Sequence, residues 1–258
     1  MSGAQTDLDA AVAALRARLA AVLRGGGTIA LLSGAGMSAE SGIATFRDAQ
    51  TGLWSRFDPM QLASEEGFRA DPAMVWRWYA ERREGVRAAS PNAGHLALGE
   101  FARRHPGRLT VITQNVDDLH QRAGNTDAIR LHGDILADRW LGGCPRGRGC
   151  DLAAALPGAP PRCGECGALV RPGVVWFGEY LPAAATRAAE AAADACAAML
   201  VVGTSGAVWP AAGLAQRARA AGAWVAIVNP QPSEIDEAAQ QCLRGTAAVV
   251  LPRVLDRL

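Results

Sequence analysis

The amino-acid sequence predicts an α/β fold, namely a doubly wound parallel sheet of the Rossmann-like type with a smaller inserted part. The apolar runs are mostly continuous rather than alternating, which is typical of parallel strands covered on both faces. Helical patterns separate several of these runs, as in folds that alternate strands and helices. Small or polar residues directly follow six of the runs, where an open α/β sheet holds its ligand. We therefore expect one ligand crevice at the carboxyl edge of a single sheet.

The expected elements alternate along the chain. Apolar residues at helical spacing predict a first helix over residues 8–23, which the glycines at 25–27 end. The predicted strands cover residues 28–32, 109–113, 129–131, 174–177, 199–202, 224–228 and 247–251. The predicted helices between them include residues 92–104, 183–198 and 211–221. The six polar strand ends are residues 33–36, 114–117, 132–133, 178–179, 203–205 and 229–230.

Two stretches interrupt this alternation and predict a smaller second domain. Residues from about 49 to 90 are rich in tryptophan and charge and have no strand-like run, so we expect a helical module. Residues from about 136 to 171 are rich in cysteine, glycine and proline. We expect the two insertions to pack together. The larger, dinucleotide-binding domain then comprises about 1–48, 91–135 and 172–258.

Composition and charge exclude several classes of protein. The 258 residues are 50% hydrophobic and 20% charged, as in folded soluble proteins. The 26 basic and 25 acidic residues leave a net charge of +1, so neither nucleic acid nor an acidic membrane is the expected partner. Every basic residue is arginine, which excludes Schiff-base chemistry and the lysines of phosphate loops and kinases.

Targeting segments are not expected. Charged residues interrupt any signal-peptide core in the first 25 positions. The one long uncharged run lies between Asp194 and Arg217 and contains Gly203 and Pro210, which fits a strand, a loop and a helix start better than a membrane span. The sequence therefore predicts a cytoplasmic protein without a membrane anchor.

A glycine-rich segment follows the first predicted strand. Gly34-Ala-Gly-Met-Ser-Ala39 has the G-x-G-x-x-A form of the dinucleotide fingerprint, in which bare backbone can approach a pyrophosphate. Glycine-rich turns are common, so the motif alone does not establish this function. An ordinary Rossmann unit also places an acidic residue after a second strand, whereas Asp48 and Asp58 lie in a stretch without one. This departure argues against an ordinary dehydrogenase.

Four cysteines cluster in the second insertion. Cys163 and Cys166 have zinc-knuckle spacing, whereas Cys144 and Cys150 are further apart than usual. A reducing compartment disfavours a disulfide, and four thiolates without a nearby histidine suit one closed, structural zinc site. Independent thiols are the alternative. Cys196 and Cys242 lie in apolar surroundings and are expected to be ordinary buried residues.

Taken in order, the motifs resemble those of the sirtuins, NAD-dependent protein deacylases. The matching segments are residues 34–47, 114–120, 132–133, 171–179, 203–205, 208–212 and Asn229, and the similarity extends from about residue 28 to the C-terminus. The resemblance implies NAD as co-substrate and acylated-lysine proteins, bound as an extended peptide, as partners. It implies a general base at His132 and catalytic support from Asn115 and Asp117. A monomer is expected.

The resemblance also implies the binding residues. In the first loop, Phe46 would shield the reactive ribose carbon and Arg47 would lie near the phosphates. The implied NAD contacts are Gly34, Ala35, Gly36, Ser38, Ala39, Phe46, Arg47, Gln114, Asn115, Val116, Asp117, Gly203, Thr204, Ser205, Asn229 and Ala247. The substrate peptide would pair, as an added strand, with a segment that includes Val175, Phe177, Gly178 and Glu179.

The family mechanism gives His132 a defined task. The acyl oxygen of the substrate attacks the ribose C1′ and nicotinamide leaves. His132 then accepts a proton from a ribose hydroxyl, which attacks the imidate and yields free lysine and O-acyl-ADP-ribose. Imidazole suits this step because its ordinary pKa lies near working pH. Of the other histidines, His95 and His105 are interpreted as surface or packing residues, and His120 as structural.

One helical motif predicts which acyl group is removed. Tyr79 and Arg82 lie three residues apart, hence on one helix face, and resemble the Tyr-x-x-Arg pair of the bacterial class III sirtuins. A guanidinium and a phenol can bind the distal carboxylate of succinyl- or malonyl-lysine, so desuccinylation and demalonylation are expected beside deacetylation. A solvated arginine beside an amphipathic tyrosine is the simpler alternative.

Departures from the family pattern leave alternatives open. Trp140 stands where many sirtuins have their first zinc cysteine, so Cys144 must take that role here. Ala44 replaces a usual proline and Asp48 a small residue. The remaining alternatives are a zinc-containing NAD-dependent oxidoreductase, a non-catalytic NAD or ADP-ribose binding module, and a zinc-ribbon nucleic-acid binder.

Overall fold

The computed structural model describes residues 3–43, 58–142, 150–256 and 258. Phe46, Arg47 and Cys144, together with the departures at Ala44 and Asp48, lie outside the described residues. None of the helices in the described ranges is long and apolar enough to cross a membrane.

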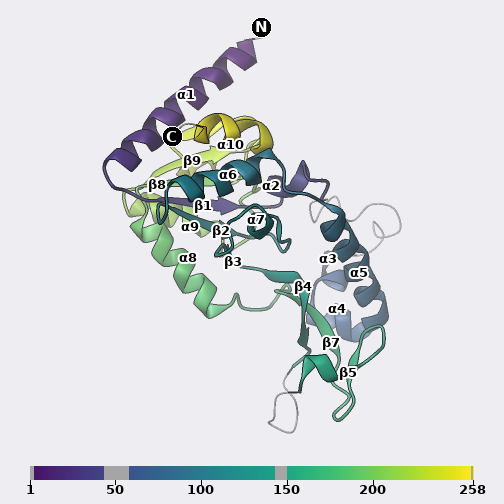
Figure 1. The fold of residues 1–258 in the computed structure, drawn as a ribbon. Coiled ribbons are helices and arrows are strands. Elements are labelled where there is room, and N and C mark those ends of the chain that lie inside the picture. Colours follow the sequence, from purple (N-terminus) through teal and green to yellow (C-terminus); the bar gives the residue numbers. More distant parts are fainter. Residues whose placement is uncertain (1–2, 44–57, 143–149, 257) are drawn as a thin grey trace.

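Six parallel strands form the central sheet, in the order β10-β9-β8-β1-β2-β3 (Figure 1). The strands are β1 (Ile29–Ser33), β2 (Leu109–Thr113), β3 (Ile129–Arg130), β8 (Ala198–Val202), β9 (Trp224–Val228) and β10 (Gln241–Leu243). The chain builds β1 to β3 in one direction and then returns to the other side of β1 for β8 to β10. The order therefore reverses between β1 and β8, which is the point where such sheets bind ligands. This confirms the predicted doubly wound fold.

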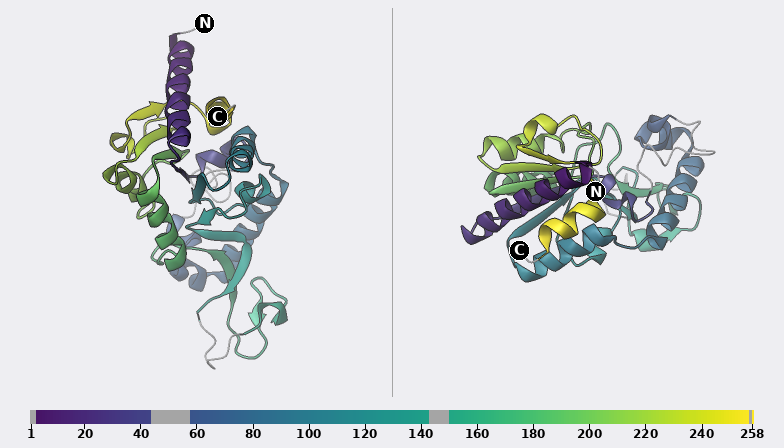
Figure 2. Two further views of the ribbon diagram at one scale, coloured as in Figure 1. Left: turned by 60° about the vertical axis from the view of Figure 1, so that its left-hand side comes forward. Right: turned by 90° about the horizontal axis from the view of Figure 1, so that it is seen from above.

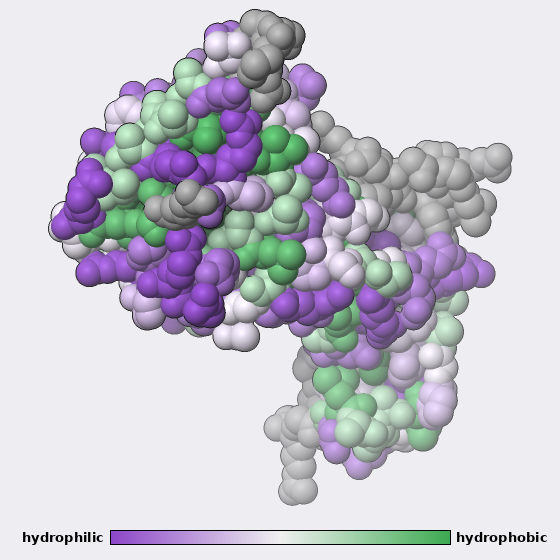
Figure 3. All heavy atoms as spheres, turned by 45° about the horizontal axis from the view of Figure 1, so that its top comes forward, coloured by the Kyte–Doolittle hydropathy of each residue, from purple (hydrophilic) through white to green (hydrophobic). Residues whose placement is uncertain are grey.

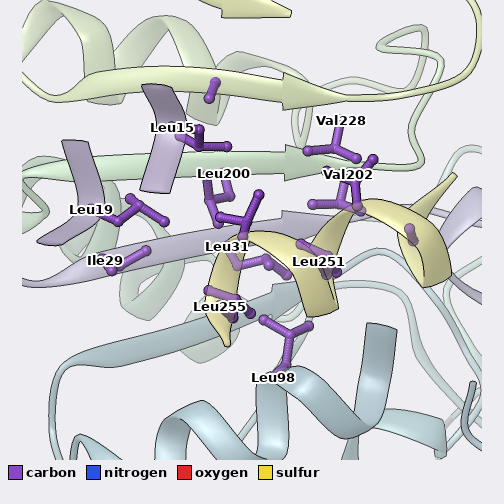
Figure 4. Close-up of a cluster of buried hydrophobic side chains, with 14 of the residues drawn as sticks. Leu15, Leu19, Ile29, Leu31, Leu98, Leu200, Val202, Val228, Leu251 and Leu255 are labelled. Atoms are coloured by element: carbon purple, nitrogen blue, oxygen red, sulfur yellow. The ribbon is translucent and has the colours of Figure 1, made fainter. Parts of the chain in front are cut away.

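Helices cover both faces of the sheet (Figures 1 and 2). On one face lie α1 (Gly3–Arg24), α6 (Ala93–Arg104) and α10 (Ala247–Leu255), and on the other α8 (Ala183–Ala195) and α9 (Gly213–Ala220). Adjacent strand residues point to opposite faces of the sheet. Leu31 packs in the first core, under α1, α6 and α10, and Leu32 packs in the second core, under α8 and α9. Figure 4 shows the first core, where Leu15, Leu98 and Leu251 from three helices meet Leu31. Continuous apolar strands follow from this double burial.

The two insertions pack together beside the sheet. The first forms α3 (Pro59–Leu62), α4 (Glu65–Ala70) and α5 (Pro72–Ala88). The second lies between the antiparallel strands β4 (Gly133–Trp140) and β7 (Val170–Val174) and contains the small pair β5 (Ala155–Leu156) and β6 (Arg162–Cys163). Phe68 and Trp78 of the first insertion belong to a core against which Leu136, Leu141 and Leu169 of the second insertion pack. Figure 3 shows a narrow lobe beneath the larger body. The exact domain boundaries stay a prediction.

Short polar side chains begin the helices of the first insertion. Asp58 accepts the amide of Met60 and forms a capping box with Gln61. Ser64 caps α4, and Asp71 caps α5 ahead of a proline in its first turn. These caps fix where three consecutive helices start and therefore how α5 faces β4.

Arg83 joins α5 to β4. The residue is 8% exposed, and its guanidinium donates to the carbonyl oxygens of Ile135 at 2.6 Å and Ala137 at 3.0 Å. It also forms an ion pair with Asp138 at 2.6 Å. These acceptors lie where the register between β4 and β7 shifts, so the irregularity in β4 provides carbonyl groups for Arg83.

Three predictions about elements were wrong. Residues 247–251 belong to helix α10 rather than to a strand, because a short apolar run does not distinguish a buried strand from a buried helix. Of residues 174–177 only Val174 lies in a strand, and that strand pairs antiparallel with β4 outside the large sheet. The predicted helix 183–198 ends at Ala195, so that β8 can begin at Ala198.

Some elements had no counterpart in the predictions. Strand β10 has half-buried Gln241 and Cys242 at the sheet edge, so its sequence lacks a continuous apolar run. Two short helices, α2 (Gly36–Ala39) and α7 (Leu119–Arg122), follow strand ends. Ser38 of α2 and the Leu119 amide of α7 both donate hydrogen bonds to the Asp117 carboxylate.

Candidate active site

A cavity of about 940 Å³ lies between the strand ends of the sheet and the inserted module. It gathers residues from four of the six predicted strand ends. Its lining includes Ala35, Ser38, Tyr79, Arg82, Gln114, Asn115, Val116, Asp117, His132, Val175, Phe177, Gly178 and Glu179. Val208 and Trp209, which follow β8, complete one side of the lining. This volume falls in the usual range for small-molecule and cofactor sites.

The first glycines of the fingerprint allow two loops to touch. Gly36 donates its amide to the carbonyl of Gly203 at 2.8 Å, and a Cβ at Gly36 would lie 2.8 Å from the Gly203 Cα. A Cβ at Gly34 would meet the Thr204 Cβ at 2.7 Å. Gly203 itself has a φ of +63°, a conformation that favours glycine. Loop contact at the switch point thus explains these glycines without a ligand.

Three buried polar side chains meet on the cavity wall. Ser38 donates to Asp117 at 2.9 Å and accepts from the Asn115 amide nitrogen at 3.1 Å. Ser38 is 1% exposed and Asp117 5%. Burial raises the pKa of Asp117, and hydrogen bonds from the Leu119 amide and Ser38 oppose this rise. The structure therefore joins residues of two predicted motifs into one polar cluster.

His132 lies on the same cavity with a defined tautomer. Its Nδ1 is 2.9 Å from the carbonyl oxygen of Gln114, so Nδ1–H donates and Nε2 is left as an acceptor in the neutral ring. The ring is half-buried. Burial lowers the pKa of His132, and the hydrogen bond to Gln114 opposes this change. A neutral imidazole with a free Nε2 lone pair can accept a proton.

Thr204 connects the predicted NAD contacts that lie further from His132 through hydrogen bonds to its hydroxyl and carbonyl. Gln114 donates to its hydroxyl at 3.2 Å, and Asn229 donates to its carbonyl at 3.3 Å. Ser205 holds the next turn, since its carbonyl accepts the Glu234 amide at 2.9 Å. Ala247 begins helix α10, is 3% exposed and does not line the cavity.

Tyr79 and Arg82 both line the cavity from helix α5. The Tyr79 hydroxyl accepts a hydrogen bond from Nε1 of Trp176 at 2.9 Å, and burial raises the pKa of Tyr79 to about 12. Burial lowers the pKa of Arg82, while the nearby Asp117 carboxylate opposes this change. The guanidinium lies 4.7 Å from the centre of the Trp78 ring. The phenol therefore stays neutral and the arginine provides a partly desolvated positive charge.

The segment from Val175 to Glu179 is held by the chain itself. The amides of Val175 and Phe177 donate to the carbonyls of His132 and Ala63, each at 2.9 Å. These two amides are therefore already bonded, and an incoming peptide would pair with other backbone groups of this segment.

Sequence reasoning gave no role to Arg171, which anchors that segment. Arg171 is 2% exposed, forms an ion pair with Glu179 and donates to the Val174 carbonyl at 2.7 Å. Arg139 also pairs with Glu179 at 2.8 Å. Burial raises the pKa of Glu179, but the bond from Arg171, the Trp176 amide and the two positive charges outweigh it and lower the pKa. Glu179 lines the cavity with its carboxylate already engaged. The signal was Arg171 itself, an arginine between apolar residues.

Three of the four predicted metal ligands meet at the end of the small module. The sulfur atoms of Cys150, Cys163 and Cys166 lie within 4.8 Å of one another, and those of Cys150 and Cys166 are 3.6 Å apart. Amides of Cys166 and Glu165, with the Cys150 thiol, lower the pKa of Cys163 to about 7. Cys196 is buried, as expected, and Cys242 is half-buried.

Together, the fold and site define a class: an α/β protein whose cavity at the switch point of a parallel sheet holds a buried polar cluster and a half-buried histidine, with a cysteine-rich insertion beside it. Comparison with known proteins places it more narrowly. Residues 34–210 match the model of the Sir2 family. The chain belongs to the Sir2 family.

Curated relatives and solved structures agree with this assignment. An NAD-dependent protein deacylase of Ralstonia nicotianae is 54% identical over 227 residues, covering 88% of this chain and 90% of that protein. One of Methylococcus capsulatus is 50% identical over 252 residues, covering 93% and 96%. The crystal structure of a Sir2 homologue with NAD has a TM-score of 0.78 at 41% identity and covers 88% of both chains. A Sir2 protein bound to a propionylated peptide has a TM-score of 0.73 at 30% identity, covering 88% and 91%.

Proposed function

We propose that this chain removes acyl groups from protein lysines in an NAD-dependent reaction that gives nicotinamide and O-acyl-ADP-ribose. The observation that carries the proposal is His132, whose Nδ1 is held by the Gln114 carbonyl and which shares one cavity with the cluster of Ser38, Asn115 and Asp117. The names of the relatives, NAD-dependent protein deacylases, support the same activity.

The residues present fit a dinucleotide. The cavity volume suits a cofactor-sized ligand, and the buried Ser38–Asn115–Asp117 cluster offers both donors and acceptors. When bound, NAD would supply the ribose carbon that reacts with the acyl oxygen. Asn115 and Asp117 would hold the nicotinamide and its ribose. Gly203, Ser205 and Asn229, joined around Thr204, would hold the adenosine half.

His132 would act as the general base. Its neutral form predominates near neutral pH because burial lowers its pKa. Nε2 would accept a proton from a ribose hydroxyl, while Nδ1–H stays bonded to the Gln114 carbonyl. The carbonyl fixes the ring orientation in the way that a carboxylate does in other catalytic sites.

Tyr79 and Arg82 would select acyl groups that end in a carboxylate. Both line the same cavity as His132, from the α5 side. A neutral phenol and a partly desolvated guanidinium can together bind a carboxylate with charge-assisted hydrogen bonds. We therefore propose desuccinylation and demalonylation beside deacetylation.

The substrate would bind as an extended peptide of a protein, and the enzyme would act as a monomer. Phe177 and Gly178 line the cavity in the segment that Arg171 and Glu179 hold in place. A rigid segment of this kind suits strand addition because less order is lost on binding.

One structural zinc would stabilise the small module. A tetrahedral thiolate site places neighbouring sulfurs about 3.8 Å apart, close to the 3.6 Å between Cys150 and Cys166. Cys163 would be the third ligand and Cys144 the fourth. Four protein ligands would fill the coordination sphere of the zinc, so the metal would take no part in the reaction.

The test is incubation of the protein with NAD and matched acetyl- and succinyl-lysine peptides, followed by mass spectrometry. The expected products are nicotinamide and O-acyl-ADP-ribose in equal amounts. Formation of reduced cofactor instead would favour the oxidoreductase alternative. Intact NAD and intact peptide would reject the proposal.

A further inference from the structure

The carbonyl that orients His132 belongs to a peptide unit that is held from its other end. The unit joins Gln114 to Asn115, so its oxygen accepts from His132 Nδ1 and its N–H belongs to Asn115. This N–H donates to the hydroxyl of Thr113 at 3.0 Å. The peptide unit that contacts His132 is therefore also held by a side chain that does not line the cavity.

The hydrogen bonds continue from Thr113 to two further buried side chains. The hydroxyls of Ser33 and Thr113 are 2.9 Å apart, and Ser33 Oγ lies 2.9 Å from Nε2 of His120. These three side chains are at most 1% exposed. Ser33 and Thr113 are register partners at the ends of β1 and β2, and His120 lies in α7. Two strands and a helix thus fix the chain of hydroxyls.

His120 is the last member of this chain of hydrogen bonds and is 1% exposed. Its ring packs edge-on against His95 at a centroid distance of 4.9 Å. Burial, with the nearby His95, lowers the pKa of His120 to about 3, and burial lowers that of His95 to about 4. Both rings are therefore neutral at neutral pH. A neutral His120 can satisfy Ser33 without placing a charge next to the peptide.

We propose that Thr113, Ser33 and His120 are positioning residues that orient His132 through the Gln114–Asn115 peptide. With the Asn115 N–H fixed by Thr113, the Gln114 carbonyl is directed at Nδ1 and cannot rotate away. Without the hydroxyl, a buried N–H loses its partner and the peptide can turn towards another acceptor. The inference rests on the proposed base role of His132 for its effect on turnover, but its geometric content does not.

The experiment compares Thr113→Val, which keeps shape and removes the hydroxyl, with Thr113→Ser, which keeps the hydroxyl. Thr110→Val, three positions earlier in the same strand, is the matched control. Two quantities are measured: kcat as a function of pH, and the protonation and tautomer of His132 by ¹⁵N NMR. The other titratable groups that line the cavity are unchanged in all variants: Tyr79, Arg82, Asp117, Glu179, Tyr180 and Arg187.

Thr113→Val is expected to lower plateau kcat by about three- to tenfold, the range for one lost hydrogen bond, with KM for NAD within about twofold. The Nδ1–H tautomer of His132 should lose population, and the acid limb of the kcat profile should move to lower pH because the opposing hydrogen bond weakens. Thr113→Ser should recover most of the loss, and Thr110→Val should change neither quantity.

A second pair of variants, at His120, tests the other end of the hydrogen-bond chain. It also keeps the inference testable if one variant fails to fold. His120→Gln can still place an amide near Ser33, whereas His120→Leu cannot, so the glutamine variant should recover turnover and the His132 tautomer. An unchanged tautomer and kcat in Thr113→Val and His120→Leu would overturn the inference while the proposed function stands. A wild-type protein without deacylation would reject the proposed function, and the tautomer measurement would still decide the positioning role.

Discussion

The indole Nε1 of Trp140 donates a hydrogen bond to the backbone carbonyl of Cys150 at 2.7 Å. The side chain of Trp140 thus holds the backbone of one of the three cysteines of the cluster. The contact connects the last residue of β4 to the cysteine cluster across the second insertion.

Replacing Trp140 by phenylalanine keeps most of the aromatic packing and removes this donor. We expect zinc to leave the variant faster, by about two- to tenfold, because one hydrogen bond that orders a ligand is lost. The measurement is the rate of zinc release to a chromogenic chelator. Equal release rates in parent and Trp140→Phe would show that the indole does not support the metal site.

Loss of a metal ligand should act through folding. Freshly purified protein is expected to contain one zinc per chain, and Cys163→Ser or Cys166→Ser should lose the metal and unfold the small module, because binding energy at such sites is folding energy. Metal analysis and circular dichroism measure both effects, with Cys242→Ser as the control outside the cluster. Protein that is purified without zinc yet fully folded would contradict this expectation.

His132→Ala should keep the fold and the binding of NAD while losing turnover by roughly 10²–10⁴-fold, the usual contribution of a general base. The measurement is kcat with an acetyl-lysine peptide, with NAD binding followed by calorimetry. His105→Gln is the control among the remaining histidines. Turnover of His132→Ala within about threefold of the parent would remove this residue from the chemical step.

Arg82→Met should separate two substrates. Loss of a charge-assisted hydrogen bond is expected to lower kcat/KM for a succinyl peptide at least about tenfold, whereas an acetyl peptide, which has no carboxylate, should change less than about threefold. Arg77→Met, on an exposed position of the same helix, is the matched control. Equal losses on both peptides would make Arg82 a structural residue and reject the assigned acyl preference.

The buried histidines predict a loss of stability in mild acid. His95 and His120 have folded pKa values of about 4 and about 3, below the ordinary 6.5. Between the folded pKa values and 6.5, the unfolded chain binds protons that the folded chain does not. The free energy of unfolding should therefore fall as pH drops below about 6.5. Each histidine contributes up to about 1.4 kcal/mol per pH unit.

Urea unfolding between about pH 6.5 and 5 measures this slope, and His120→Gln should reduce it by about one proton. His105→Gln, at the half-buried C-cap of α6, serves as the control. A stability that does not change over this range would mean that neither buried ring resists protonation.

Burial on both faces made most of the sheet predictable. Strands such as β8 and β9 carry continuous apolar sequence because helices cover them from each side. The same rule failed at residues 247–251, where a buried helix has an equally continuous run, and at β10, where the sheet edge needs few apolar residues. Local pattern reports burial more directly than it reports backbone conformation.

The sequence predicted which motifs form the site, but it did not predict which of their side chains contact one another. The glycine-rich loop and residues 114–117 pointed to one crevice, but the bond from Ser38 to Asp117 depends on the spacing of two strands. The hydroxyls of Ser33 and Thr113 gave no signal, since serine and threonine are common at strand ends and their pairing follows from strand register. Arg83 was likewise invisible beside Arg82, because only the structure shows which of two adjacent arginines turns inward to β4.

That pair of arginines has a consequence for engineering. Adjacent helical residues point about 100° apart, so the three acceptors that hold Arg83 also set the rotation of α5 about its axis and with it the direction of Arg82. Transplanting Tyr79 and Arg82 alone into another scaffold would copy two side chains without the contacts of Arg83 that set their orientation. A successful graft needs the irregular stretch of β4 as well, and an altered β4 could retune the pocket without any change in its lining.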